Sequence, residues 1–245
     1  MTPGIFITGT STGVGKTLVT AAWTRALAQR GHRVVALKPV ASGATRDAAG
    51  QLRNADALEL QAAASVPRSY ERVNPYCFEA PVAPHVAAEE AGERISVPQL
   101  CDWYRQASAG ADLALVEGAG GWRVPLHPDG FLSDLPEQLG LGVVLVVGLT
   151  LGCLNHARLT VEALEHAGRC PFLGWIGNQV DPGFDRLDAN LRALERLLGA
   201  PPLALIPTLG AHPELGSLVG HFGPGTACEL LAQRLVDGRN LINGM

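Results

Sequence analysis

The glycine-rich segment at residues 9–17 constrains the fold of this chain more than any other part of the sequence. It reads Gly-Thr-Ser-Thr-Gly-Val-Gly-Lys-Thr and satisfies the pattern G-x-x-x-x-G-K-T. The apolar run from Ile5 to Thr8 precedes it, and residues 16–30 read as a helix that Gly31 stops. A strand, a glycine loop and a helix in this order predict a phosphate-binding loop whose backbone N–H groups hold a polyphosphate.

Lysine is rare in this chain. The 19 basic residues comprise 17 arginines and only two lysines, Lys16 and Lys38. Lys16 belongs to the glycine loop, where it is predicted to lie near the β- and γ-phosphates. Lys38 follows the apolar run Val34–Leu37 and is expected at the end of a second strand. Both lysines are therefore expected at strand ends, where an open α/β sheet places its ligands; the alternative for Lys38 is an ordinary surface lysine.

The rest of the chain alternates between apolar runs and helical segments. Strands are predicted at 113–116, 143–147, 172–176 and 203–206, and helices at 55–64, 97–108, 155–167, 186–198 and 226–236. The proline-rich stretch from Pro75 to Pro84 is predicted to be a loop. Continuous apolar strands separated by helices indicate a mostly parallel β-sheet with helices on both faces. We therefore expect residues 1–245 to form a single α/β domain that is P-loop NTPase-like.

Composition argues against several functional classes. The net charge is −4 and no cluster of Lys and Arg marks a surface for nucleic acid or anionic membrane. The longest apolar run, Val143–Val147, is too short to span a bilayer. Five scattered cysteines without a C-x-x-C pair argue against a disulfide framework or a zinc site. We expect a soluble cytoplasmic protein that binds neither nucleic acid nor membrane.

Two residues besides Lys16 are candidates for the phosphate and metal chemistry. Thr17 is expected to place its hydroxyl on Mg²⁺. Glu117 ends the predicted strand at 113–116, where a Walker-B carboxylate belongs, and the glycine-rich segment 118–121 after it lets a ligand approach the backbone. Asp56 begins the predicted helix at 55–64 and is, by itself, a routine acid favoured by the helix dipole.

Two further strand ends carry polar groups. Asn178-Gln179-Val180-Asp181 is similar to the N-K-x-D guanine motif of GTPases, but Gln179 replaces its lysine, so the sequence does not predict a GTPase. Asn178 can still bond an adenine edge. The segment Gly152–Asn155 opens the predicted helix at 155–167, and a helix N-terminus binds anions. The alternative for Asn155 is a plain N-cap.

Six segments together resemble dethiobiotin synthetase, a family of biotin biosynthesis, and the likeness runs from about residue 4 to about residue 215. The segments are Gly9–Thr17, Lys38–Gly43, Leu52–Leu58, Val73–Tyr76 with Pro84-His85, Val116–Trp122 and Leu151–Ala157.

The resemblance implies a reaction. It is the ATP-dependent carboxylation and ring closure of 7,8-diaminopelargonate (7,8-diaminononanoate) with CO2, which gives dethiobiotin, ADP and phosphate. One substrate amine captures CO2 as a carbamate, the γ-phosphoryl group moves to it to form a carbamic–phosphoric anhydride, and the second amine closes the ring. Phosphoryl transfer depends on positioning and charge neutralisation more than on a covalent nucleophile.

The resemblance also implies site residues. The catalytic set is Thr12, Lys16 and Lys38, and the Mg²⁺ ligands are Thr17, Asp56 and Glu117. The nucleotide contacts are Gly13, Val14, Gly15, Lys16, Thr17, Asp56, Glu117, Gly118, Ala119, Gly120, Asn178, Gln179, Pro207, Thr208 and Leu209. The substrate contacts are Thr12, Lys38, Ser42, Gly121, Leu151 and Asn155. The segment from Leu151 to Asn155 is expected to receive the substrate carboxylate across a homodimer interface, which makes the active site shared.

Some positions depart from the family pattern, and two other functions are compatible with a phosphate loop. Ser11 and Gly13 replace acidic loop residues, and the position nearest to an aromatic contact of some members is Asn190. One alternative is the phosphate-loop domain of a glutamine-dependent amide synthase, which would need a glutaminase. The other is a P-loop regulatory or partitioning ATPase; such proteins commonly carry a lysine where this chain has Thr10.

Overall fold

A six-stranded parallel sheet forms the centre of the fold. The computed structural model describes residues 1–128, 130–208 and 215–238. The strands are β1 (Gly4–Gly9), β2 (Val34–Leu37), β7 (Leu113–Glu117), β10 (Gly142–Gly148), β11 (Phe172–Asn178) and β12 (Ala204–Ile206). They lie in the order β12-β11-β10-β1-β7-β2, and each neighbouring pair is parallel. This confirms the parallel sheet predicted from continuous apolar runs.

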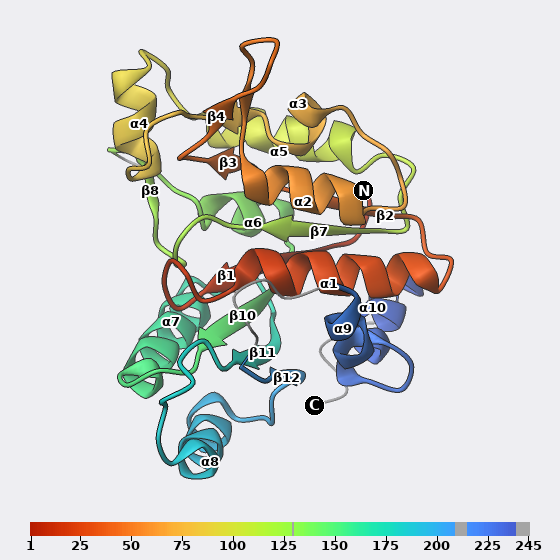
Figure 1. Cartoon of the computed structure of the whole chain (residues 1–245), viewed down its shortest axis with the longest axis vertical. Helices are drawn as coiled ribbons and strands as arrows, with labels where there is room; N and C mark the ends of the chain where they lie inside the picture. The colour runs from red at the N-terminus through yellow and green to blue at the C-terminus, as the bar shows by residue number, and fades with distance from the viewer. Residues whose placement is uncertain (129, 209–214, 239–245) are drawn as a thin grey trace.

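Helices cover both faces of this sheet, as predicted (Figure 1). One face holds α1 (Lys16–Gln29), α2 (Ala55–Ala63), α9 (Leu215–Leu218), the 3-10 helix η1 (Val219–Phe222) and α10 (Ala227–Val236). The other holds α5 (Val97–Ala107), α6 (Asp134–Leu139), α7 (Cys153–Ala167) and α8 (Leu187–Leu198).

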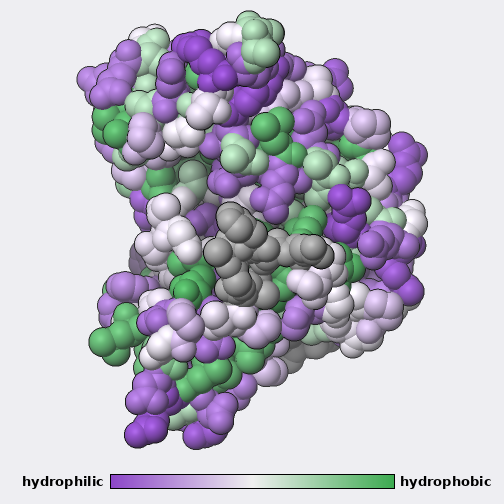
Figure 2. Space-filling view, viewed as in Figure 1, coloured by the Kyte–Doolittle hydropathy of each residue, from purple (hydrophilic) through white to green (hydrophobic). Residues whose placement is uncertain are grey.

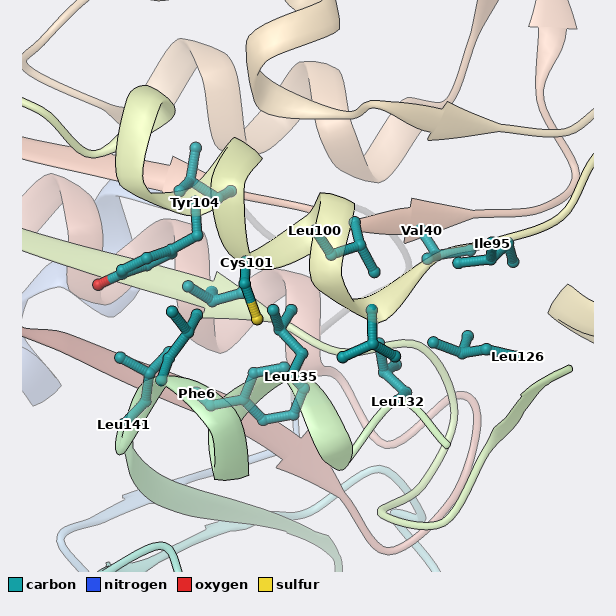
Figure 3. Packing of buried hydrophobic residues seen from close by; sticks show 14 of the residues in the cluster. Phe6, Val40, Ile95, Leu100, Cys101, Tyr104, Leu126, Leu132, Leu135 and Leu141 are labelled. Carbon is teal, nitrogen blue, oxygen red and sulfur yellow. The ribbon is translucent and has the colours of Figure 1, made fainter. Parts of the chain in front are cut away.

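Side chains of β1 alternate between these two layers. Ile5 and Ile7 pack in the cluster that contains α1 and α10, whereas Phe6 packs against α5 and α6. Figure 3 shows Phe6 beneath Cys101 of α5 and Leu135 of α6. The strand that carries the phosphate loop is therefore buried on both faces and has a paired strand at each edge, which gives the loop a rigid base.

Short elements at the carboxyl edge of the sheet complete the fold. They are the parallel pair β3 (Val40–Ala41) and β6 (Tyr76–Cys77), the antiparallel pairs β4 (Thr45–Arg46) with β5 (Leu52–Arg53) and β8 (Pro125–His127) with β9 (Gly130–Phe131), and the helices α3 (Tyr70–Val73) and α4 (Pro84–Glu90). The prediction of a loop from Pro75 to Pro84 is wrong in part. β6 lies inside that stretch, and Pro84 begins α4, because proline fits the first turn of a helix.

No helix among the described residues is long and apolar enough to cross a membrane.

Candidate active site

A cleft of about 760 Å³ opens at the carboxyl ends of β1, β2 and β7. It brings together twelve of the predicted site residues, which come from the phosphate loop, the segments after β2 and β7, and the first turn of α2. They are Thr12, Gly13, Gly15, Lys16, Thr17, Lys38, Ser42, Asp56, Glu117, Ala119, Gly120 and Gly121.

The phosphate loop adopts a conformation that depends on glycine. Gly13 and Gly15 have φ angles of 77° and 86°, in the left-handed region that other residues avoid. A Cβ on Gly15 would also overlap the side-chain amide of Asn178. Val14 between them is buried, and its carbonyl accepts a hydrogen bond from Asn178 Nδ2 at 2.9 Å. The loop is thus fastened to the end of β11.

Lys16 is buried at the start of α1. It is 6% exposed, and its Nζ donates to the carbonyl of Ser11 at 3.0 Å, so the side chain curls back under the loop. Burial lowers the pKa of Lys16 to about 8; Lys38 adds to the lowering, whereas Glu117 and Asp56 oppose it. A bound polyphosphate would supply the counter-charge that this ammonium lacks.

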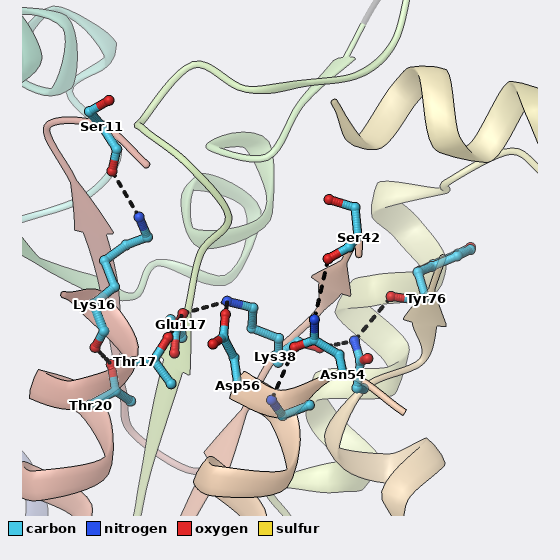
Figure 4. A network of polar contacts seen from close by, with 12 residues as sticks. Ser11, Lys16, Thr17, Thr20, Lys38, Ser42, Asn54, Asp56, Tyr76 and Glu117 are labelled. Atoms are coloured by element: carbon cyan, nitrogen blue, oxygen red, sulfur yellow. Dashed lines mark hydrogen bonds and ion pairs between the residues drawn. The ribbon is translucent and has the colours of Figure 1, made fainter. Parts of the chain in front are cut away.

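Lys38 lies just after β2 and forms two ion pairs across the cleft floor (Figure 4). Its Nζ contacts Glu117 Oε1 and lies 3.2 Å from Asp56 Oδ2. Burial acts to lower the pKa of Lys38, but attraction to Glu117 and Asp56 outweighs burial and raises it. The side chain is only 5% exposed, so the alternative of an ordinary surface lysine is wrong.

Three oxygen-bearing side chains converge beside Lys38. Thr17 Oγ1 donates to Glu117 Oε1 at 2.9 Å, and Asp56 approaches from the first turn of α2. The second carboxylate oxygen of Glu117 is buried and has no hydrogen-bond partner. Hydroxyl and carboxylate oxygens are ligands that Mg²⁺ accepts, and nucleotide phosphates supply the rest of its shell. The residues present therefore fit a magnesium ion.

The residues predicted for the adenine lie away from this floor. Asn178 is 4% exposed at the end of β11, and its amide nitrogen donates a hydrogen bond to the carbonyl of Val14. Gln179 donates its backbone N–H to the carbonyl of Ile206 at 2.9 Å, while Pro207 and Thr208 follow β12 and are exposed. Predicted residue Leu209 lies outside the described residues. Gly118 is buried against Phe6.

The segment predicted to bind the substrate carboxylate does not line the cleft of its own chain. Leu151 is 95% exposed, and Asn155 is also exposed. α7 begins at Cys153 with Gly152 as its N-cap, because Gly152 reaches a φ of 96° that reverses the chain. The alternative of Asn155 as an N-cap is therefore wrong; it lies in the first turn. Asn190 lies on α8, where its amide donates to the carbonyls of Asp185 and Arg186.

Sequence reasoning missed part of the cleft wall. Asn54, Val124, Pro125 and the segment 81–84 also line it. The sequence predicts only a loop for the proline-rich segment, because prolines carry no polar side chain that would indicate a binding site. Asn54 could have been identified as the N-cap of the predicted helix at 55–64, since Asn is a preferred N-cap.

Comparisons with known proteins point to one family. The AAA domain family matches residues 3–215. The "ATP-dependent dethiobiotin synthetase BioD" of Pseudomonas paraeruginosa (strain DSM 24068 / PA7) is 50% identical over 208 residues, which is 84% of this chain and 90% of the relative. The protein of the same name from Cellvibrio japonicus (strain Ueda107) is 48% identical over 204 residues, 83% of this chain and 89% of the relative.

Solved structures share the fold at low identity. The septum site-determining protein MinD of Pyrococcus horikoshii OT3, complexed with Mg-ADP, has a TM-score of 0.57 and 19% identity, covering 97% of this chain and 96% of that chain. A ParA family ATPase from Chlorobium tepidum TLS has a TM-score of 0.53 and 15% identity, covering 97% of this chain and 98% of that chain. The likeness is one of fold, that of P-loop NTPases.

Proposed function

Because the chain belongs to the dethiobiotin synthetase family, we propose that its cleft binds ATP, CO2 and 7,8-diaminopelargonate and closes the ureido ring of dethiobiotin there. The protein is a ligase of biotin biosynthesis that uses ATP. The observation that carries the proposed chemistry is the convergence of Lys38, Asp56 and Glu117 beside the phosphate loop.

The phosphate loop is the nucleotide site of this proposal. The N–H groups at the start of α1 would face the polyphosphate, and Lys16 would move from the Ser11 carbonyl to the β- and γ-phosphates. Thr17, Asp56 and Glu117 would hold Mg²⁺, which would supply positive charge beside the phosphates. Asn178, Gln179, Pro207 and Thr208 would flank the adenine, with Leu209 as a further contact.

The two lysines would supply the positive charge that this reaction needs. A carbamate and a γ-phosphoryl group are both anionic, so their approach needs fixed positive charge. Lys38 would hold the carbamate, with Thr12 and Ser42 near the substrate amines. The carbamate oxygen attacks the γ-phosphorus and ADP leaves. The second amine then attacks the carbamate carbon, and phosphate leaves with its bonding pair as the ring closes.

The carboxylate end of the substrate is assigned to a partner subunit. Leu151, just before α7, is 95% exposed, Leu159 of α7 is 55% exposed, and Leu197 of α8 is 38% exposed. Figure 2 shows hydrophobic side chains gathered on this lower part of the molecule. Burial of such a surface favours a homodimer. In it, Leu151 and Asn155 at the start of α7 would reach the substrate on the other chain.

Two broader features belong to the same proposal. Residues 1–245 act as one synthetase domain, since the cleft draws its lining from segments between Ser11 and Pro125 around one sheet. The protein works in the cytoplasm, where ATP is available; its five cysteines are free thiols, as a reducing compartment keeps them.

A coupled assay of ADP release tests the function. The purified protein should release ADP when diaminopelargonate, bicarbonate, ATP and Mg²⁺ are all present, with dethiobiotin formed in equal amount. Omitting either the diamine or bicarbonate should stop it. ADP release at an unchanged rate without the diamine would indicate a nucleotide switch instead.

A further inference from the structure

The hydroxyl of Tyr70 lies at the centre of a buried hydrogen-bond network beside the cleft. It accepts a hydrogen bond from the backbone N–H of Asn54 at 2.7 Å and donates one to Asn74 Oδ1 at 3.0 Å. Tyr70 is 7% exposed and Asn74 is 2% exposed, so water does not compete for these bonds. Tyr70 and Asn74 are not among the residues that line the cleft.

One arm of the network holds the backbone of Lys38. Asn74 Nδ2 donates to the Lys38 carbonyl at 2.8 Å, and the Lys38 N–H donates to the carbonyl of Val73 at 2.9 Å. Lys38 is the first residue after β2, so the sheet no longer holds it. The segment Val73–Asn74 therefore fixes the point from which the Lys38 side chain reaches Glu117.

The other arm holds the turn that carries Asp56. Asn54 is the N-cap of α2, and its Oδ1 accepts the N–H of Ala57 at 3.2 Å. Its Nδ2 donates to the carbonyl of Ser42 at 3.3 Å (Figure 4). Asp56 lies two residues after Asn54, in the first turn of α2. The bond from Asn54 to Tyr70 thus ties this turn to the segment that holds Lys38.

The ring of Tyr70 is itself held in place. The guanidinium carbon of Arg53 lies 4.3 Å from the ring centroid, a cation–π contact. Arg53 in turn pairs with Asp47 at 3.2 Å, and it precedes the cap residue Asn54 directly. Removing only the hydroxyl would therefore leave the ring and its stacking partner in position.

We propose that Tyr70 and Asn74 are positioning residues that set Lys38 and Asp56 in the mutual arrangement needed for metal and carbamate. The identity of the reaction rests on the proposed function; the arrangement of Lys38 and Asp56 does not. Residues that orient metal ligands from behind typically change metal affinity or activity by about 10- to 100-fold when mutated.

The test variant is Tyr70→Phe, which keeps the ring but leaves the Asn54 N–H and Asn74 Oδ1 without their shared partner. Binding of ADP in the presence of Mg²⁺, measured by calorimetry, should weaken by about tenfold because Asp56 is displaced. Binding of ADP in EDTA should stay unchanged, since the phosphate loop is not part of the network. In turnover, kcat should fall by about tenfold and the KM for ATP should rise only at limiting Mg²⁺.

Tyr104→Phe is the matched control. Tyr104 is fully buried, and its hydroxyl donates to the carbonyl of Thr2 at 3.0 Å, near Gly4 at the end of β1 away from the phosphate loop. Both variants should lower the melting temperature, but only Tyr70→Phe should weaken the binding of ADP in the presence of Mg²⁺. Asn74→Ser, which shortens the link to Lys38, should repeat the effect of Tyr70→Phe on kcat.

An effect of Tyr70→Phe limited to the melting temperature, equal to that of Tyr104→Phe, would overturn the proposal. If Tyr70→Phe does not fold, an unchanged kcat in folded Asn74→Ser would overturn it as well. In an Asp56→Asn background, Tyr70→Phe should not weaken Mg²⁺-dependent ADP binding any further. An additional weakening in the double variant would contradict action through Asp56. The ADP titrations decide these points even if the wild type forms no dethiobiotin.

Discussion

Lys38 and Glu117 form an ion pair at the floor of the cleft in which both side chains are almost inaccessible to water, at 5% and 1% exposure. The pair uses Oε1 of Glu117, and this oxygen also accepts a hydrogen bond from the Thr17 hydroxyl. The other carboxylate oxygen, Oε2, has no hydrogen-bond partner. The ammonium of Lys38 therefore lies among the side chains proposed to hold Mg²⁺, and at such a site binding of the metal would be coupled to the position of this ammonium.

Lys38→Met should bind Mg²⁺-ADP more tightly and yet lose turnover. A unit charge near a divalent ion contributes on the order of 1 kcal/mol or more, so removing it should strengthen metal-dependent ADP binding by about tenfold. Turnover should fall by roughly a hundredfold or more because the carbamate loses its cation. Calorimetry across a Mg²⁺ series measures the first effect. Arg25→Met, which removes an exposed charge from α1, is the control and should change neither quantity.

Asp56→Asn and Glu117→Gln should both weaken Mg²⁺-dependent ADP release but differ in stability. The Asp56 side chain is 47% exposed, so its substitution should leave the melting temperature nearly unchanged. Glu117 is buried against Lys38, and removing one partner of a buried pair costs up to about 3–5 kcal/mol. Asp56 still contacts Lys38 and should reduce that loss. A Mg²⁺ titration with thermal melts checks both, and an unchanged Mg²⁺ requirement in both variants would remove them from the metal site.

Lys16→Arg should be nearly as damaging as Lys16→Ala. The Lys16 side chain is enclosed beneath the loop, with its Nζ 3.0 Å from the carbonyl of Ser11, so a planar guanidinium would not occupy the same space. Losses of roughly a hundredfold in kcat are expected for both variants. Steady-state ADP release measures this, and near-normal turnover by Lys16→Arg would show that any cation suffices.

Mixing two inactive variants should restore activity if the site is shared between subunits. Lys38→Ala removes a residue of the cleft, while Asn155→Asp would repel the substrate carboxylate from the neighbouring chain. In a mixed dimer one site carries both lesions and the other carries neither. Equal, random mixing should recover about one quarter of the wild-type sites. A mixture that stays inactive although mass spectrometry detects mixed dimers would place Asn155 outside the shared site.

The free energy of unfolding should fall as the pH rises above about 9, in part through Cys228. Burial raises the pKa of this fully buried thiol to about 12, whereas in the unfolded chain it has its ordinary value near 9.0. Between these values only the unfolded chain loses the proton, so stability is complete below pH 9 and declines above it, by about 1.4 kcal/mol per pH unit for one thiol. Urea unfolding at several pH values should show a shallower decline in Cys228→Ala, and an identical slope would contradict the assignment.

The sequence predicted the six strands of the central sheet and six of its helices, α1, α2, α5, α7, α8 and α10, because each strand is a continuous apolar run and these helices separate or follow the strands. It did not predict α6, α9 or η1, which span only four to six residues each and are too short for a helical period to stand out. It could not predict the pairing of β3 with β6, since two-residue strands have no periodicity and meet through contacts between distant segments. Likewise, the start of α7 depends on the positive φ of Gly152, which residue type permits but does not require. At the site, the loop and strand ends were predictable. The link from Tyr70 to Asn54 was not, because it joins residues that only the folded chain brings together.

The position of β1 between β7 and β10 has a consequence for how the chain is made. β1 precedes both of its partners along the chain: Ile5 pairs with Leu115 on one side and with Gly142 on the other. The strand that bears the phosphate loop can pair with β7 (Leu113–Glu117) first, but its other edge stays unpaired until β10 (Gly142–Gly148) has been synthesised. Such long-range pairing slows folding, and an unpaired apolar edge promotes aggregation. A nascent chain that stalls before β10 emerges is therefore a substrate for chaperones rather than a partly working enzyme.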